Sequence, residues 1–306
     1  MTLVVGLPRD ERATAAVQLG VMLARSLDED LVVCTVVPPP WPPGMGRVDA
    51  EYQEYLDHSA QEAIERARGL VPADRAAEFV VARARSTSAG LLEVAQEHGA
   101  RLLVLGSSTA GVLGRVAFGS VAHRLLHSSP LPVVLGPRGF RCRPESTVRR
   151  VTAAFGATEG ADEMVIAVAG VAARAGAALR IASFAVRPRT PLTAGIGSHA
   201  EDAVAHEWAA DIGRAQRAVV EAVERLPRLP SAIETAVGHG TDWAGAIEEI
   251  GWEDGDLLAV GSSTEGPLEH VFIGSRSSRI VRHSPVPVVV VPRGAAQALA
   301  ERAERS

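Results

Sequence analysis

Two related loops of the sequence carry glycine, serine and threonine at spacings that suit a phosphate group. The first, GSSTAGVLGRVAFGS, covers residues 106–120 between the apolar run LLVL and a stretch with helical character. Gly106 lets the backbone turn and approach a ligand, and Gly119 removes a side chain where the next helix opens. Backbone N–H groups and the positive end of a helix dipole would favour an anion there. Such a loop is also often only a turn, with Ser120 as a helix cap, so both interpretations stay open.

The same loop occurs a second time, as GSSTEGPLEHVFIGS over residues 261–275. At a constant offset of 155 residues, 18 of the 34 positions of residues 106–139 are identical in residues 261–294. Ordinary composition would give about one match in fifteen to twenty. The long period indicates a duplicated domain rather than a solenoid. The second loop carries Gly261, Gly274 and Ser275 at the positions of Gly106, Gly119 and Ser120, so the same contacts are expected in both halves.

Alternating apolar and amphipathic segments predict an α/β fold with two doubly wound domains, each a five-stranded parallel sheet flanked by helices. Runs such as LPVVL and VPVVVV are apolar throughout, which is typical of strands covered on both faces. Right-handed crossovers then give an open sheet in each half. The expected parts are a first domain at 1–140, a linker at 141–148, a second domain at 149–294 and a tail at 295–306.

The pattern predicts strands near 2–7, 31–37, 78–84, 102–106 and 131–135, then 151–155, 179–186, 233–237, 257–261 and 286–291. It predicts helices near 11–27, 50–70, 86–98 and 120–127, then 161–175, 199–225, 241–251 and 275–283. Ser86 or Ser88 is expected to cap one of these helices, which Gly99 ends, and Thr241 to cap another. Ligands of such folds bind at the carboxyl ends of the strands, where both glycine loops begin.

Composition excludes several classes of function. The sequence has no lysine, so a Walker A loop and a Schiff-base mechanism are both ruled out. The net charge of −5 argues against a nucleic-acid partner. No apolar run approaches the ~18 residues of a membrane span, and no signal peptide is evident. Cys34 and Cys142 fit neither a disulfide framework nor a metal site, so we expect a cytoplasmic protein without a membrane partner.

Other candidate residues indicate little chemistry. His123 and His127 have the i, i+4 spacing of metal ligands but lack the H-E-x-x-H glutamate and a third ligand, so no metal is expected. His239 is interpreted as a solvated turn residue, and Trp243 and Trp252 as packing residues. No G-x-S-x-G elbow, general base or paired metal carboxylate is evident. We expect no catalytic residue and no enzyme, with weak ATP hydrolysis left open.

Each half resembles a universal stress protein domain. The nucleotide signature of that family is a glycine, two residues, a second glycine, nine residues and then Gly-Ser or Gly-Thr. GSST, AGVLGRVAF and Gly119-Ser120 fill these positions, as do GSST, EGPLEHVFI and Gly274-Ser275. The resemblance therefore implies ligand contacts at Gly106, Ser107, Thr109, Gly119, Ser120, Gly261, Ser262, Thr264, Gly274 and Ser275. SSPLPVVLGPRG and HSPVPVVVVPRG resemble the final strand of the family, and Asp256 its fourth-strand entry, where the first half has Arg101. The resemblance implies that the two final strands pair, giving a pseudo-dimer that dimerises again.

The resemblance also implies a stress-response sensor or regulator that binds ATP or another adenine nucleotide and acts on an unidentified regulatory protein. A second hypothesis is a scaffold or interaction protein on the same fold, without a nucleotide. It rests on Thr109 and Thr264, which replace the second glycine of the signature. It also rests on Pro8 and Gly156, which stand where nucleotide-binding members carry an aspartate.

Overall fold

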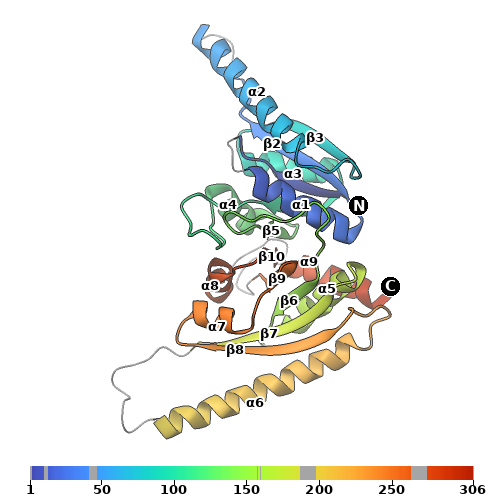
Figure 1. Ribbon diagram of the computed structural model, residues 1–306, viewed down its shortest axis with the longest axis vertical. Coiled ribbons are helices and arrows are strands. Elements are labelled where there is room, and N and C mark those ends of the chain that lie inside the picture. The colour runs from blue at the N-terminus through green and yellow to red at the C-terminus, as the bar shows by residue number, and fades with distance from the viewer. Residues whose placement is uncertain are drawn as a thin grey trace.

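The chain forms two α/β halves joined through one continuous sheet in a computed structural model (Figure 1). The structure describes residues 2–9, 13–40, 47–156, 158, 160–186, 198–262 and 274–305. Thr264 and the rest of the second glycine loop up to residue 273 lie outside these ranges. None of the described helices is long and apolar enough to cross a membrane.

The first half alternates strands and helices in the predicted order. Its strands are β1 (Thr2–Gly6), β2 (Asp30–Val37), β3 (Ala77–Arg83), β4 (Ala100–Leu105) and β5 (Val133–Leu135). Its helices are α1 (Ala13–Leu27), α2 (Arg47–Arg68), α3 (Thr87–Glu97) and α4 (Ser120–Ser128).

The second half repeats this order and adds a terminal helix. Its strands are β6 (Arg150–Ala154), β7 (Ala178–Val186), β8 (Ile233–Gly240), β9 (Asp256–Gly261) and β10 (Val288–Val291). Its helices are α5 (Ala161–Arg174), α6 (Ser198–Val223), α7 (Trp243–Glu249), α8 (Ser275–His283) and α9 (Arg293–Arg305).

The sheet has the strand order β3-β2-β1-β4-β5-β10-β9-β6-β7-β8. Neighbours are parallel within each half, which confirms the doubly wound fold class. At the centre, β5 and β10 pair antiparallel, with Val134 opposite Val289. The pairing of the two final strands is therefore confirmed, and the halves form a pseudo-dimer within one chain.

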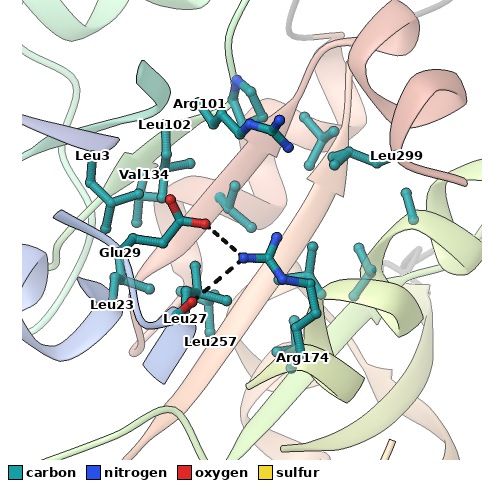
Figure 2. A pocket seen from close by; sticks show the side chains of 17 residues that line it. Leu3, Leu23, Leu27, Glu29, Arg101, Leu102, Val134, Arg174, Leu257 and Leu299 are labelled. Atoms are coloured by element: carbon teal, nitrogen blue, oxygen red, sulfur yellow. Dashed lines mark hydrogen bonds and ion pairs between the residues drawn. The ribbon is translucent and has the colours of Figure 1, made fainter. Parts of the chain in front are cut away.

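Two apolar clusters cover the two faces of the sheet, and each contains residues of both halves. Leu19 of α1 and Val165 of α5 belong to the cluster beneath α1, α2, α5, α6 and α9. Leu125 of α4 and Val281 of α8 belong to the cluster beneath α3, α4, α7 and α8. The core thus continues across the junction of the halves. On the first of these faces a small cavity remains above β5 and β10 (Figure 2).

Several local expectations are settled by the described geometry. Ser86 caps α3, and Gly99 follows that helix with a positive φ of 57°, as predicted. The α7 cap was wrong by one residue, because the side chain of Asp242, not Thr241, accepts a bond from Gly245 N at 2.8 Å. His239 is exposed but lies in β8, where a turn was expected.

The tail after the second domain continues as the helix α9. It packs along α5, and a Cβ placed on Gly170 would stand 2.5 Å from the Cβ of Ala303. The absence of a side chain at residue 170 is what allows the two helices to approach so closely. Ala296 and Ala300 of α9 are buried in the shared core. The helix is therefore an integral part of the second half.

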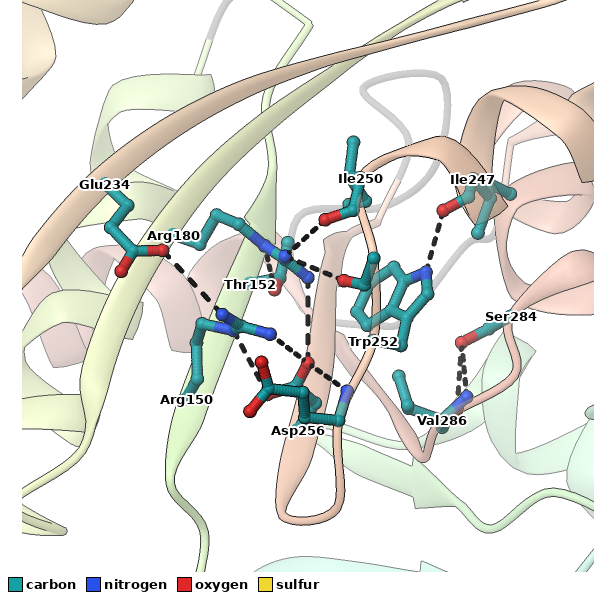
Figure 3. A network of polar contacts seen from close by, with 12 residues as sticks. Arg150, Thr152, Arg180, Glu234, Ile247, Ile250, Trp252, Asp256, Ser284 and Val286 are labelled. Carbon is teal, nitrogen blue, oxygen red and sulfur yellow. Dashed lines mark hydrogen bonds and ion pairs between the residues drawn. The ribbon is translucent and has the colours of Figure 1, made fainter.

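A buried carboxylate, Asp256, holds the start of β9 against the start of β6 (Figure 3). Its side chain is 2% exposed. It accepts bonds from Nε and Nη2 of Arg150 at 3.1 and 2.6 Å, and from the backbone N of Glu253 at 3.0 Å. The hydrogen bond to Asp256 raises the pKa of Arg150, so this guanidinium stays charged.

Arg180 of β7 completes this cluster. Its Nη1 donates to the carbonyls of Ile250 and Gly251 at 2.8 Å each, and its Nε donates to Thr152 Oγ1 at 3.0 Å. Its guanidinium carbon lies 4.7 Å from the ring centroid of Trp252. Trp252 and Trp243 both pack against the apolar core, which confirms their predicted packing role. The cluster joins three strands and the loop before β9.

Replacing the central carboxylate should destabilise the protein strongly. Asp256→Asn keeps the shape but removes the only negative charge that touches both guanidiniums in the described cluster. We expect a loss of about 3 kcal/mol in unfolding free energy, because removing one partner leaves buried charge uncompensated. Urea unfolding followed by circular dichroism measures this loss. Arg214→Gln, which breaks the exposed pair with Asp211, should cost less than about 1 kcal/mol, and equal losses for both variants would contradict the prediction.

The two cysteines should be poorly reactive in the folded protein. Burial raises the pKa of Cys34 to about 12 and that of Cys142 to about 11. A rise of two units lowers the thiolate fraction of Cys142 about 100-fold at neutral pH. We expect slow modification by an aromatic disulfide reagent in the native state and fast modification in concentrated guanidinium chloride. Fast native labelling of the Cys142→Ser variant, in which only the buried Cys34 remains, would contradict this account.

Candidate functional site

The first candidate site lies at the carboxyl ends of β1 and β4. The chain proceeds from β1 outward to β2 and β3 and then returns to β4 on the other side of β1, so a topological switch point falls between these strands. Gly106 follows β4 at this point, as the sequence predicted. Its counterpart Gly261 ends β9, beside β6, in the second half. Each expected loop therefore starts where ligands bind in this class of fold.

The loop after β4 folds back onto the end of β5. Ser107 Oγ donates to Gly136 O at 2.6 Å and accepts a bond from Ala117 N at 2.9 Å. Ser108 N donates to Ala117 O at 2.9 Å. A Cβ placed on Gly111 would stand 2.2 Å from the Cβ of Ala117, so this fold requires a glycine at residue 111. The Ser107 hydroxyl thus organises the loop from inside.

Arg138 fastens the tip of the same loop. Its Nη1 donates to Gly111 O at 2.6 Å, and its backbone N donates to Arg115 O at 2.9 Å. Gly114 N donates in turn to Arg138 O at 2.9 Å. This residue was not among the expected site residues. The signal that points to it is Pro-Arg-Gly, which ends the repeated segment in both halves.

Arg115 carries the loop across to the second half. Its Nη1 donates to the carbonyl of His283 at 2.7 Å, at the end of α8. Its Nη2 forms an ion pair with Glu248 of α7. The tip residues Val112 and Leu113 are each 72% exposed. The loop is therefore attached at its base to the first half, and Arg115 attaches it to α7 and α8 of the second half.

The helices that follow both loops begin without a side-chain cap. Gly119 and Gly274 are the N-cap residues of α4 and α8, and neither helix has a side-chain cap hydrogen bond. Ser120 and Ser275 are the first helical residues and are exposed, so of the two interpretations left open for Ser120 the helix cap does not hold. Such a helix start offers its first N–H groups to an anion.

The second loop repeats the attachment of the first at its base. Ser262 N donates to Val291 O at 2.9 Å, and Ser262 Oγ accepts a bond from Arg293 N at 3.0 Å. Ser277 Oγ donates to Gly261 O at 3.2 Å. As with Ser107, the serine after the first glycine ties the loop to the end of the final strand.

Neither half has an acidic side chain at the position expected after its first strand. Pro8 is half-buried after β1, and Gly156 is exposed after β6. Neither residue offers a carboxylate to a ribose hydroxyl. In the second half Arg293 Nε and Glu163 Oε2 each lie 3.7 Å from where a Cβ of Gly160 would stand, at the start of α5.

The histidines of α4 stand apart from this arrangement. The rings of His123 and His127 lie 4.6 Å apart and are tilted by 56°. Burial and the neighbouring His123 lower the pKa of His127. In the part of the chain that the structure describes, no group of three His, Cys, Asp or Glu side chains is placed to hold a metal ion.

Comparison with known proteins agrees with this architecture. The model of the universal stress protein family matches residues 1–137 and 147–292. A universal stress protein of Mycobacterium tuberculosis H37Rv is 39% identical over 297 residues, which cover 95% of this chain and 100% of that protein.

Two solved structures have the same fold over nearly the whole chain. A universal stress protein from Archaeoglobus fulgidus is 18% identical, with a TM-score of 0.58 and coverage of 96% of this chain and 98% of that one. A protein of unknown function from Pseudomonas aeruginosa PAO1 is 15% identical, with a TM-score of 0.58 and coverage of 100% and 97%. The family match in both halves and the full-length relative show that this chain belongs to the universal stress protein family.

Proposed function

We propose that this stress-response protein binds ATP or another adenine nucleotide at the carboxyl ends of the strands of each half. The observation that carries the proposal is the uncapped start of α4 at the switch point between β1 and β4. Its first N–H groups and the helix dipole favour the phosphate groups of the ligand. The exposed hydroxyl of Ser120 adds a donor at the same place. Gly274 and Ser275 supply the same features at the start of α8.

In this proposal the remaining loop residues shape the cleft. Gly106 and Gly261 open it at the strand ends, and Thr109 stands exposed on the loop. Ser107 and Ser262 hold the loops in place through the bonds described above. Thr264 is assigned the same role as Thr109 by the repeat alone. No residue acts as a catalyst, and the nucleotide serves as a signal.

In this proposal Arg115 couples nucleotide binding in the first half to the helices of the second half. A nucleotide at the start of α4 would press on the loop that Arg115 fastens to α7 and α8. The relative position of the halves would then report occupancy to a regulatory protein partner. The same proposal places the protein in the cytoplasm, as a homodimer of tandem chains.

A second candidate function is a scaffold that binds a protein and no nucleotide. Pro8 and Gly156 favour it because they provide no carboxylate for a ribose. The exposed Val112 and Leu113 favour it as well, since a braced loop with an apolar tip suits a protein contact. The two functions make opposite predictions for a nucleotide titration.

Blocking either helix start should remove binding in that half. Gly119→Val and Gly274→Val place a branched side chain beside the first N–H groups of α4 and α8. We expect each to weaken one class of site at least tenfold, about 1.4 kcal/mol. Equilibrium dialysis with labelled ATP, ADP, AMP and cyclic AMP measures the affinities and the number of sites.

The matched control is Gly69→Val, at an exposed glycine that follows α2 at the opposite end of the first half. It should leave binding unchanged. Absence of saturable binding of all four nucleotides to the folded wild type would overturn the nucleotide proposal and favour the scaffold. Equal binding by Gly119→Val, Gly274→Val and the wild type would place the nucleotide elsewhere.

A further inference from the structure

A cavity of about 110 Å³ lies above the central junction of the sheet (Figure 2). Its base includes Val134 of β5 and Val289 of β10, which are paired across the antiparallel junction. Both halves contribute to its walls, in which aliphatic side chains predominate. We call it the seam cavity and define it by Leu3, Leu23, Val134, Val168, Val289 and Leu299.

Three helices form the walls of the seam cavity above this base. Helix α1 of the first half contributes Leu23, and helix α5 of the second half contributes Val168. Helix α9 adds a further wall through Leu299. This helix lies after residue 292, where the match to the family model ends. The cavity is therefore partly built by a segment outside the matched family fold.

Contacts between the walls keep the seam cavity from closing. Arg174 at the end of α5 donates to Glu29 Oε1 at 2.6 Å across the two halves, and the Glu29 side chain is only 4% exposed. Helix α9 already touches α5, since a Cβ placed on Gly170 would stand 2.5 Å from the Cβ of Ala303. The walls are thus fixed to one another and cannot move inward. Because the cost of an apolar void depends on how far its surroundings can collapse, a braced void of this kind persists.

The charged side chains of the lining do not form a site for an ion. Glu29 and Arg174 pair with each other, and Arg101, the third charged residue of the lining, is not without a partner either. A ligand that carried a charge into the cavity would lose its hydration among aliphatic side chains without gaining a free opposite charge. The lining therefore favours an uncharged ligand.

The seam cavity is accessible from solvent. Leu27, Leu102, Val171 and Leu299 belong to its lining and are half-buried. Partly exposed side chains of this kind change rotamer in picoseconds to nanoseconds. A small molecule can therefore enter past them while the two halves stay joined.

We propose that the seam cavity binds a compact uncharged molecule with a hydrocarbon body, which lies over Val134 and Val289 and contacts both halves. An apolar cavity of about 150 Å³ stays dry and accepts benzene, so the smaller seam cavity suits roughly four or five non-hydrogen atoms. The bound molecule gains dispersion contacts that the lining of an empty cavity lacks. Binding to the folded chain stabilises the junction of the halves. This site is separate from the proposed nucleotide sites at the strand ends.

The test uses the full chain with cyclopentane as the probe and pyrrolidinium as a charged ring of the same size. NMR of the protein with labelled Leu and Val methyl groups should show saturable shifts at Val134, Val289 and Leu299 as cyclopentane is added. Pyrrolidinium should bind at least tenfold more weakly, because its charge would be buried without a partner. Absence of saturable shifts up to the solubility limit of cyclopentane would overturn the proposal, as would equal affinity for pyrrolidinium.

A filled variant and a matched control locate the binding. Ala167 of α5 lines the cavity, so Ala167→Leu should weaken cyclopentane binding at least tenfold by occupying the space. Ala218→Leu makes the same change at an exposed residue of α6 and should leave the affinity unchanged. Saturating cyclopentane should raise the Tm of Ala218→Leu and not that of Ala167→Leu. If Ala167→Leu does not fold by circular dichroism, Val171→Phe fills the cavity from the same helix. Equal cyclopentane affinity of the filled and control variants would contradict the assignment of the ligand to the seam cavity.

Discussion

The antiparallel pairing of β5 with β10 is the constraint on which the rest of this structure depends. Each half is a parallel sheet whose final strand, buried and apolar, would otherwise be an unpaired edge. Joining the two edges makes one ten-stranded sheet, and the apolar core on each face of it contains residues of both halves. The antiparallel pairing also reverses the strand direction from one half to the other. The two glycine loops, which follow strand carboxyl ends, therefore leave the sheet in opposite directions. Arg115 reaches α7 and α8 because the carboxyl edge of the first half adjoins the ends of those helices.

The two halves share the backbone arrangement of their glycine loops but differ in the charge of equivalent side chains. Ser107 and Ser262 both attach their loops to the end of the final strand, at equivalent positions of the repeat but through different atoms: the hydroxyl of Ser107 donates to Gly136 O, and the backbone N of Ser262 donates to Val291 O. The strand before the loop differs: Asp256 contacts two arginines in the second half, whereas the register of β4 on β1 shifts at Arg101 in the first. The strand order is nevertheless the same in both halves. The halves have thus become chemically different at the starts of β4 and β9 while keeping one fold.

Each candidate site combines a helix N-terminus that suits an anion with the absence of the aspartate expected after the first strand of that half. Uncapped helix starts at Gly119 and Gly274 are intrinsic to the loop spacing and favour a phosphate. Pro8 and Gly156 stand where the resemblance to nucleotide-binding members predicts an aspartate. The first loop is held rigidly by Arg138 and Arg115, and this rigidity serves both a nucleotide cleft and a protein-binding scaffold. What distinguishes the two functions is therefore ligand chemistry at the helix start, and not the shape of the loop.

The sequence by itself determined the duplicated doubly wound fold, the order of the elements and the placement of the glycine loops at strand ends. The apolar periodicity and the repeat can both be recognised in the sequence without knowing which segments pack together. The sequence alone did not show that Asp242 caps α7, because the neighbouring Thr241 is an equally suitable cap. It also did not show that Ser107 is hydrogen-bonded inside its loop, or that Arg138 and Arg115 hold that loop, because these contacts join residues distant in the chain. Only the tertiary structure decided that Arg101, the pair of Glu29 with Arg174 and the helix α9 would meet above the β5–β10 junction. That cavity arises from the joining of two complete sheets, and no single segment of the sequence encodes it.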